Sequence, residues 1–142
     1  TGGKTSWCSG YACYESLDEK TKARLDGLRA THRHPHEPNN PVEVIDHPVV
    51  VRHPETGRKA LYVTPSFTRS ILGLPDDDGE ALLQQLFHHV AQPHLSWTHD
   101  WQVGDLVMWD NRCTMHRREP FPEESRRIMH RTQAFNEWIP AA

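Results

Sequence analysis

Residues 109–133 read WDNRCTMHRREPFPEESRRIMHRTQ, and this stretch decides how the rest of the chain is interpreted. RIMHRTQAF at 127–135 predicts a strand, in which alternate side chains share a face. Arg127 and Arg131 would then point the same way, roughly 13 Å apart. Buried guanidinium groups need anionic partners, and their planar fork suits carboxylates and sulfonates. The pattern allows two interpretations: an edge strand with solvated arginines, or an interior face that binds small anions.

His116 is the candidate metal ligand of the same stretch. It follows a strand predicted at 106–109, after a break at Asp110 and Asn111. A non-heme Fe(II) site needs two histidines and one carboxylate on a single face, and no His-x-Asp motif occurs in the chain. By pattern alone, a single histidine is more often structural or exposed than a ligand.

Upstream of this stretch, hydrophobic periodicity predicts two helices and several strands. A first helix is predicted at 15–29, and a second at 77–91, where three aspartates at the start complement the helix dipole. The β-prone runs 49–51 and 60–63 flank a Pro/Gly turn and predict a hairpin. Residues 95–101 predict a further strand. The fold class is therefore α+β, mostly β with helical insertions, of the jelly-roll type.

A second group of histidines lies in a proline-rich segment, 31–41, that predicts a loop. His32, His34 and His36 alternate there, so an extended backbone would place them on one side. Histidine-rich tracts can bind metal, although a flexible polar loop is the simpler interpretation.

The cysteines indicate a reduced compartment. Cys8, Cys13 and Cys113 are an odd number without dense spacing, which argues against a disulfide framework and favours a cytoplasmic protein. Cys8 and Cys13 lack zinc-site spacing and a second pair, so we expect small buried or half-exposed side chains.

Composition bounds the size and the partners. The 142 residues fit one domain, 1–142, but an apolar content of 36% is low for a self-sufficient one. A net charge of −3 with mixed signs gives no basic field for nucleic acid. No apolar run approaches the ~20 residues that span a bilayer. The opening Thr1-Gly2-Gly3 does not resemble a natural start, so we expect a fragment. The oligomeric state, including a homo-oligomer, stays open.

The stretch 109–133 resembles the C-terminal signature of the taurine/2,4-D dioxygenase (TauD/TfdA) family of Fe(II)- and 2-oxoglutarate-dependent dioxygenases. Trp-Asp-Asn-Arg, the histidine that follows and Arg-Arg-Ile-Met-His-Arg carry the likeness. HPVVVRHPETGRKALYV at 47–63 is similar to the family's central hairpin. TGGKTSWCSGYACYESL at 1–17 is similar to the segment after its first iron-binding motif. The resemblance implies a double-stranded β-helix, a jelly roll.

The resemblance also implies roles for five residues. His116 matches the distal iron ligand, and Arg127 matches the arginine that pairs with the far carboxylate of 2-oxoglutarate. Thr5 matches a threonine that hydrogen-bonds the same cosubstrate. Arg131 matches the residue that holds the anionic group of the substrate, and Phe67, more loosely aligned, lines the substrate pocket.

The implied reaction uses Fe(II), 2-oxoglutarate and O2, and hydroxylates a small anionic substrate while giving succinate and CO2. The substrate would be a sulfonate or a carboxylate, with an aryloxyalkanoate favoured by the motif. The family's His-x-Asp motif lies upstream of the part that matches 1–17, so we expect these 142 residues alone to be inactive. Two alternatives stay open: a non-catalytic remnant that keeps its anion-binding arginines, and a metal-binding module built on the loop histidines.

Overall fold

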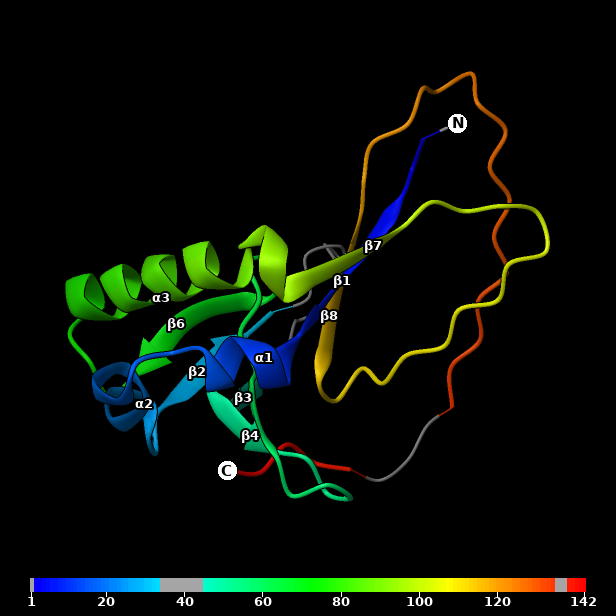
Figure 1. Cartoon of the computed structure of the whole chain (residues 1–142). Coiled ribbons are helices and arrows are strands. Elements are labelled where there is room, and N and C mark those ends of the chain that lie inside the picture. The colour runs from blue at the N-terminus through cyan, green and yellow to red at the C-terminus, as the bar shows by residue number, and fades with distance from the viewer. Residues whose placement is uncertain (1, 34–44, 135–137) are drawn as a thin grey trace.

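The strand β1 (Thr5–Ser9) is the centre of the sheet that matters for function. In the computed structural model, which describes residues 2–33, 45–134 and 138–142, β1 pairs antiparallel with β7 (Ser96–His99) on one side and β8 (Thr114–Arg118) on the other. Four of the five β1 residues are buried. Figure 1 shows the three strands together between the helix-covered part of the molecule and the long arcs that extend beyond them. The strand predicted at 95–101 is confirmed as β7.

A second sheet and a hairpin build the rest of the β structure. The sheet has the order β3–β2–β6, from β3 (Ile45–Pro48), β2 (Arg29–His32) and β6 (Thr68–Leu72), all antiparallel. The predicted hairpin is confirmed: β4 (Val50–Arg52) pairs with β5 (Lys59–Leu61) around the turn. Gly57 in that turn has φ +66°, a conformation that glycine adopts without strain.

Three α-helices cover these sheets. They are α1 (Gly10–Glu15), α2 (Glu19–Leu25) and α3 (Asp76–Val90), and the short 3-10 turn η1 (Pro93–Leu95) precedes β7. The helix predicted at 77–91 is confirmed as α3, with three aspartates in its first turn. The helix predicted at 15–29 is wrong in its bounds. Asp18 begins a new helix there, because its carboxylate accepts the Thr21 N–H at 2.9 Å, and Arg29 already belongs to β2.

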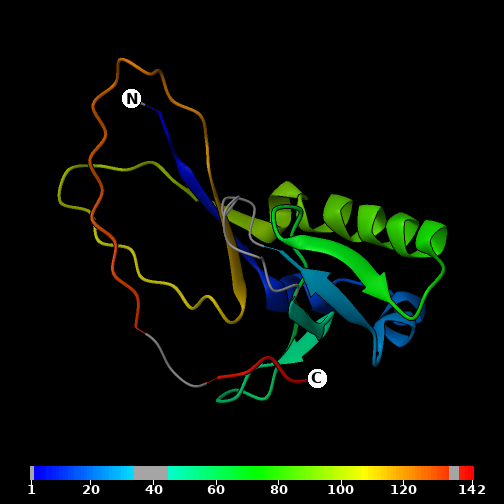
Figure 2. The same cartoon turned by 180° about the vertical axis from the view of Figure 1, so that it is seen from behind.

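The core lies beneath α3. The buried side chains of α3 are Leu82, Leu83, Leu86 and Val90, and they pack with Cys13 of α1, Ile71 of β6 and Val63, which follows β5. Figures 1 and 2 show α3 lying along β6 in both views, on one side of the second sheet. The described parts of the chain contain no helix that is both long enough and apolar enough to cross a membrane.

Two predicted strands are absent. Residues 106–109 and 127–134 have no regular secondary structure, so the predictions of strands at 106–109 and 127–135 are wrong for the residues described; 135 lies outside them. A strand needs a neighbour for its backbone hydrogen bonds, and neither segment pairs with another described strand. Both belong to arcs that leave the β7–β1–β8 sheet in Figure 1.

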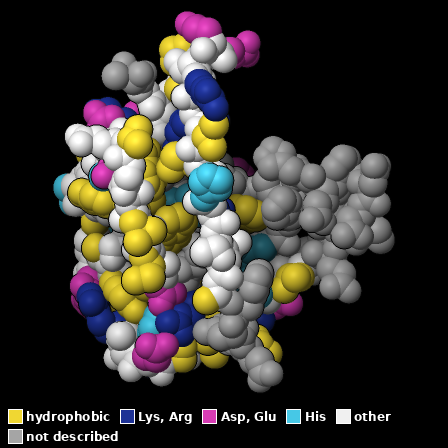
Figure 3. Space-filling view, turned by 90° about the vertical axis from the view of Figure 1, so that its right-hand side faces the viewer, with side chains coloured by type: hydrophobic (Ala, Val, Ile, Leu, Met, Phe, Trp, Pro, Cys, Tyr) yellow, Lys and Arg dark blue, Asp and Glu magenta, His cyan; other side chains and the backbone are white. Residues whose placement is uncertain are grey.

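The arcs carry hydrophobic side chains on their surface. Leu106 is 94% and Met108 is 93% exposed, and Ile128 is also exposed. Figure 3 shows hydrophobic side chains gathered on this side of the molecule. Apolar side chains with this much exposure are usually covered in a closed barrel.

The histidine-rich loop lies mostly outside the described residues. Residues 34–41, with His34 and His36, cannot be placed, so the prediction of a metal-binding tract stays untested there. Thr31 and His32 are strand rather than loop, because they pair with β3 and β6.

Candidate functional site

The two faces of β1 have different environments. Alternation puts Thr5 and Trp7 on one face, and Ser6 and Cys8 on the other. Trp7 lies opposite His116 in the β1–β8 ladder, so their side chains share a face. The Trp109 ring packs against both, with centroids 5.3 Å from Trp7 and 5.1 Å from His116. Sequence reasoning proposed His116 but missed the indoles that surround it.

His116 is held in its neutral form by its surroundings. Partial desolvation lowers the pKa of the imidazole, and the nearby positive charge of Arg131 lowers it further, although His116 as a residue is exposed. The neutral imidazole is the form that binds a metal ion. Arg131 lies beside the same group, with its guanidinium carbon 5.7 Å from the Trp109 ring centroid.

Thr5 stands at the other end of the same face. It is buried, and its hydroxyl oxygen accepts a hydrogen bond from the Trp101 indole N–H at 2.9 Å. A hydroxyl that accepts in this way still has its own proton to donate. Thr5 can therefore donate to a ligand oxygen on this face.

Arg127 is brought close to Gly3, two residues before Thr5, by the segment that follows β8. The Glu119 N–H donates to the Lys4 carbonyl at 2.8 Å, which ties the start of this segment to β1. A Cβ atom added at Gly3 would lie 3.1 Å from Arg127 Nε and 3.1 Å from a ring carbon of Phe121. Gly3, with φ +67°, therefore allows the guanidinium to approach the backbone two residues before Thr5.

Four of the five predicted residues thus gather around β1 and β8, but not in the predicted way. Arg127 and Arg131 were expected to share one strand face, and the segment that carries them is not a strand. They reach the site because this segment passes close to Gly3 and Trp109. Phe67 lies with the second sheet, where its carbonyl accepts the Arg33 N–H at 2.8 Å. Its role in a substrate pocket stays a prediction.

An indole cluster is the main feature that sequence reasoning missed. Trp97 stacks on Trp7 at 5.3 Å and Trp101 meets it edge-on at 6.1 Å, so three indoles with Trp109 contact one central ring. A signal in the sequence could have indicated this cluster. Tryptophan occurs in TSW of β1, in SWTHDW of β7 and its end, and in VMWD before β8.

Trp7 carries a buried indole N–H for which the described residues offer no hydrogen-bond acceptor. Its side chain is 6% exposed, and its Nε1 has no hydrogen-bond acceptor among the described residues. Leaving a buried N–H unpaired costs roughly 1–3 kcal/mol, so native structures usually provide an acceptor. The face shared with His116 and Thr5 therefore fits a ligand with acceptor oxygens. A carboxylate beside a metal ion meets that requirement.

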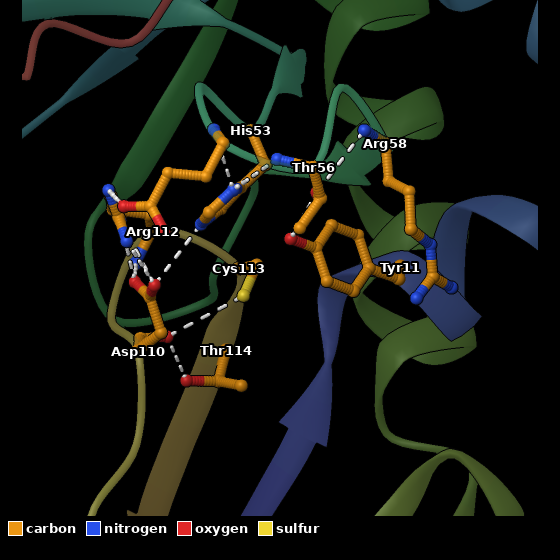
Figure 4. Close-up of polar contacts among 9 residues, drawn as sticks. Tyr11, His53, Thr56, Arg58, Asp110, Arg112, Cys113 and Thr114 are labelled. Carbon is orange, nitrogen blue, oxygen red and sulfur yellow. Dashed lines mark hydrogen bonds and ion pairs between the residues drawn. The ribbon is translucent and has the colours of Figure 1, made fainter.

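One other cluster has the composition of a metal site. His53, Asp110 and Cys113 place their ligand atoms within 4.8 Å of one another, the only such group of three among the residues described. Figure 4 shows them between the β4–β5 hairpin and the turn before β8. However, the His53 Nδ1 accepts the backbone N–H groups of Glu55 and Thr56, both at 3.3 Å. Its Nε2 therefore carries the proton and donates to Asp110 at 3.1 Å.

This cluster is a structural lock. A metal on His53 Nε2 would put a proton on Nδ1, facing two N–H donors, which is unfavourable. Asp110 is also occupied, since Arg112 donates to both its oxygens, and this ion pair holds the pKa of the carboxyl well below its usual range. The lock fixes the turn that leads into β8 and so positions His116.

Antiparallel sheets with covering helices, with an imidazole and two arginines near one of their strands, define a protein of the jelly-roll class. The chain belongs to the TauD/TfdA family: the model described as "Taurine catabolism dioxygenase TauD, TfdA family" matches residues 1–133. The family fold is the predicted jelly roll, of which this chain has part.

Individual relatives agree with this assignment. The chain is 36% identical to an alpha-ketoglutarate-dependent 2,4-dichlorophenoxyacetate dioxygenase of Burkholderia sp. (strain RASC), over 92% of this chain and 48% of that protein. It matches a taurine dioxygenase structure from Burkholderia xenovorans with TM-score 0.78 and 41% identity, over 84% of this chain and 42% of the other. It matches AAD-2 in complex with Mn(II) and N-oxalylglycine with TM-score 0.80 and 32% identity, over 88% and 54%. The chain spans about half the length of the curated relatives it matches.

Proposed function

We propose that this chain is the C-terminal part of an Fe(II)- and 2-oxoglutarate-dependent dioxygenase that hydroxylates a small anionic substrate. The observation that carries the proposal is the face shared by Trp7 and His116. Along it lie an imidazole whose pKa is lowered and an unpaired buried N–H, with one guanidinium group beside Trp109 and another beside Gly3. Such a set of donors suits two organic anions next to a metal ion.

Each residue has a distinct role in this proposal. His116 Nε2 or Nδ1 would bind the metal, since the ring is neutral. Arg127 and Thr5 would hold the distal carboxylate of 2-oxoglutarate, with Arg127 forming a bidentate ion pair and Thr5 donating its hydroxyl proton. Arg131 would hold the anionic group of the substrate on the His116 side. The chemistry that the metal supplies when bound is O2-dependent decarboxylation of 2-oxoglutarate, giving succinate, CO2 and a hydroxylated substrate.

The indole cluster would exclude water and shape the substrate. Trp109 packs against His116 and Trp7 packs against Trp109, and the low dielectric of these rings would strengthen ion pairs of Arg127 and Arg131 with the two anions. Flat aromatic walls next to an arginine suit an aryloxyalkanoate better than a short sulfonate. Curated relatives named for 2,4-dichlorophenoxyacetate and (S)-phenoxypropionate support the same choice.

The proposed holoenzyme needs more iron ligands than this chain offers. A facial site uses two histidines and one carboxylate, and only His116 matches a family ligand, because the 142 residues contain no His-x-Asp motif. We therefore infer that the chain alone does not turn over substrate. Succinate formed by these 142 residues with Fe(II), 2-oxoglutarate and a phenoxyacetate would contradict this inference.

Cosubstrate binding to the chain tests the site without turnover. We expect added 2-oxoglutarate to shift the indole N–H resonance of Trp7 and the Nε–H resonance of Arg127 in a saturable manner. The Arg127→Gln variant should bind at least about tenfold more weakly, because a charge-assisted pair is lost. The neighbouring, exposed Arg126→Gln is the matched control and should bind like the wild type. Equal weakening by both substitutions, or no saturable shift, would reject the assignment of Arg127.

A further inference from the structure

Two thiols lie in contact on the face of β1 that the proposed site does not use. The Cys8 and Cys13 Sγ atoms are 3.1 Å apart, and Cys8 Sγ also lies 3.4 Å from the Val90 carbonyl. Cys8 points away from Trp7 and into the core beneath α3. Figure 1 shows β1 running directly into α1, which carries Cys13. The pair is therefore separate from His116 and the two arginines.

The contact makes the two thiols unequal. Cys13 donates its S–H to Cys8, and this hydrogen bond lowers the pKa of Cys8 to about 7, against the opposing effect of burial. The same hydrogen bond, then burial, raises the pKa of Cys13. This shift favours the thiolate, the nucleophilic form, on Cys8 rather than on Cys13, and the partner thiol is already in contact at 3.1 Å. Cys8 is also the more accessible of the two thiols, with 8% of its surface exposed against 0% for Cys13.

We propose that Cys8 and Cys13 are an oxidation site, which a hydroperoxide converts into a reversible intramolecular disulfide. The Cys8 thiolate attacks one peroxide oxygen, the O–O bond breaks, and Cys8 becomes a sulfenic acid as hydroxide leaves. Cys13 sulfur then attacks Cys8 sulfur, the S–O bond breaks, and the departing oxygen takes up the Cys13 proton as water. In sum, two thiols and one peroxide give one disulfide and, with H2O2, two waters.

The geometry favours closure within this pair. An S–S bond is about 2.05 Å long, so the sulfur atoms at 3.1 Å need to approach by only about 1 Å. Cys13 lies in a helix of six residues, which is short enough to adjust against β1. The third thiol is an internal control. Burial raises the pKa of Cys113, whose Sγ lies 3.9 Å from the Asp110 carbonyl in the structural lock.

The test is a thiol count on the folded chain after treatment with H2O2. The chain is quenched, denatured and alkylated, and its intact mass is measured with and without a reductant. We expect one alkylated cysteine instead of three and a mass lower by two hydrogens before alkylation, both reversed by reductant. Trypsin should place the bridge in residues 5–20, the peptide between Lys4 and Lys20, which contains both thiols.

Two variants sharpen the result. Cys113→Ser should still lose two hydrogens, whereas Cys13→Ser should lose none and should instead trap a Cys8 sulfenic acid with dimedone. Three alkylated cysteines after treatment, or a bridge that includes Cys113, would overturn the proposal. The wild-type count decides the matter even if Cys13→Ser does not fold. None of these readouts depends on iron or 2-oxoglutarate binding.

Discussion

Trp7 and His116 face each other across the β1–β8 ladder, and the Trp109 ring packs against both. Register alone creates this relationship, because directly opposed residues of an antiparallel pair share a face. The position of His116 therefore depends on whatever fixes the start of β8. That start is held by the lock between the hairpin and the turn at Asp110, so the lock should matter for stability as well as for the site.

The lock predicts that His53→Ala is strongly destabilising. His53 is 4% exposed, donates to Asp110 and accepts two backbone N–H groups, so its removal takes away a buried ring and three hydrogen bonds at once. We expect the free energy of unfolding to fall by about 2–3 kcal/mol, measured by urea denaturation. A second His–Asp pair, His99 with Asp105, is more exposed and provides the control. His99→Ala should cost about 1 kcal/mol or less, and equal losses would show that no lock exists.

The lowered pKa of His32 predicts that the free energy of unfolding falls in mild acid. Burial, then the charges of His47 and Arg69, lowers the pKa of His32 from 6.5 to about 4. The unfolded chain then binds the proton more readily than the folded one, so stability is fully present above pH 6.5 and falls as the pH drops towards 4. The shift corresponds to about 3 kcal/mol.

The measurement is urea unfolding of wild type and His32→Gln between pH 7 and 4.5. Other groups titrate in this range, so the difference between the two proteins isolates His32. We expect a flatter pH profile for the variant, and an unchanged profile for the exposed control His88→Gln. Parallel profiles of wild type and His32→Gln would contradict the prediction.

Replacing Gly3 by alanine is predicted to displace the Arg127 side chain. A Cβ at Gly3 would meet the Arg127 side chain at 3.1 Å, whereas a Cβ at Gly27 would meet nothing within 4 Å. Both glycines have positive φ, +67° and +72°, so each Ala variant should lose about 1 kcal/mol through backbone strain. Only Gly3→Ala should also displace Arg127 and weaken 2-oxoglutarate binding, measured by NMR titration. Equal binding by the two variants would show that Arg127 does not depend on Gly3.

The sequence predicts local structure well where the pattern is local. The 15 residues of α3 follow from leucine spacing and the aspartates at its start, and the hairpin follows from its Pro/Gly turn. The helix at 15–29 failed because Asp18, a strong N-cap, starts a new helix inside the periodic run. Local pattern could not show that two arginines reach the site without forming a strand.

The site residues came from the family signature, and their surroundings came from the structure. His116, Thr5, Arg127 and Arg131 stand in motifs of fixed spacing, whereas Trp7 and the three indoles around it come from three separate segments. Their contact depends on strand register, which no short motif encodes. The strands predicted at 106–109 and 127–135 failed for a related reason: alternation shows that a segment can pair, but not whether a neighbour is present.

The exposed apolar side chains of the arc around 106–109 are predicted to promote self-association. Leu106 and Met108 are almost fully exposed, and an exposed apolar segment favours association between molecules. The double variant Leu106→Lys, Met108→Lys should therefore lower concentration-dependent self-association, measured by sedimentation velocity, without changing the free energy of unfolding by more than about 0.5 kcal/mol. Leu82→Ala, in the core, should by contrast cost about 2–5 kcal/mol. A loss of that size in the lysine variant would mean that the arc is packed against the body of the protein, because a charged side chain is tolerated only where water reaches it.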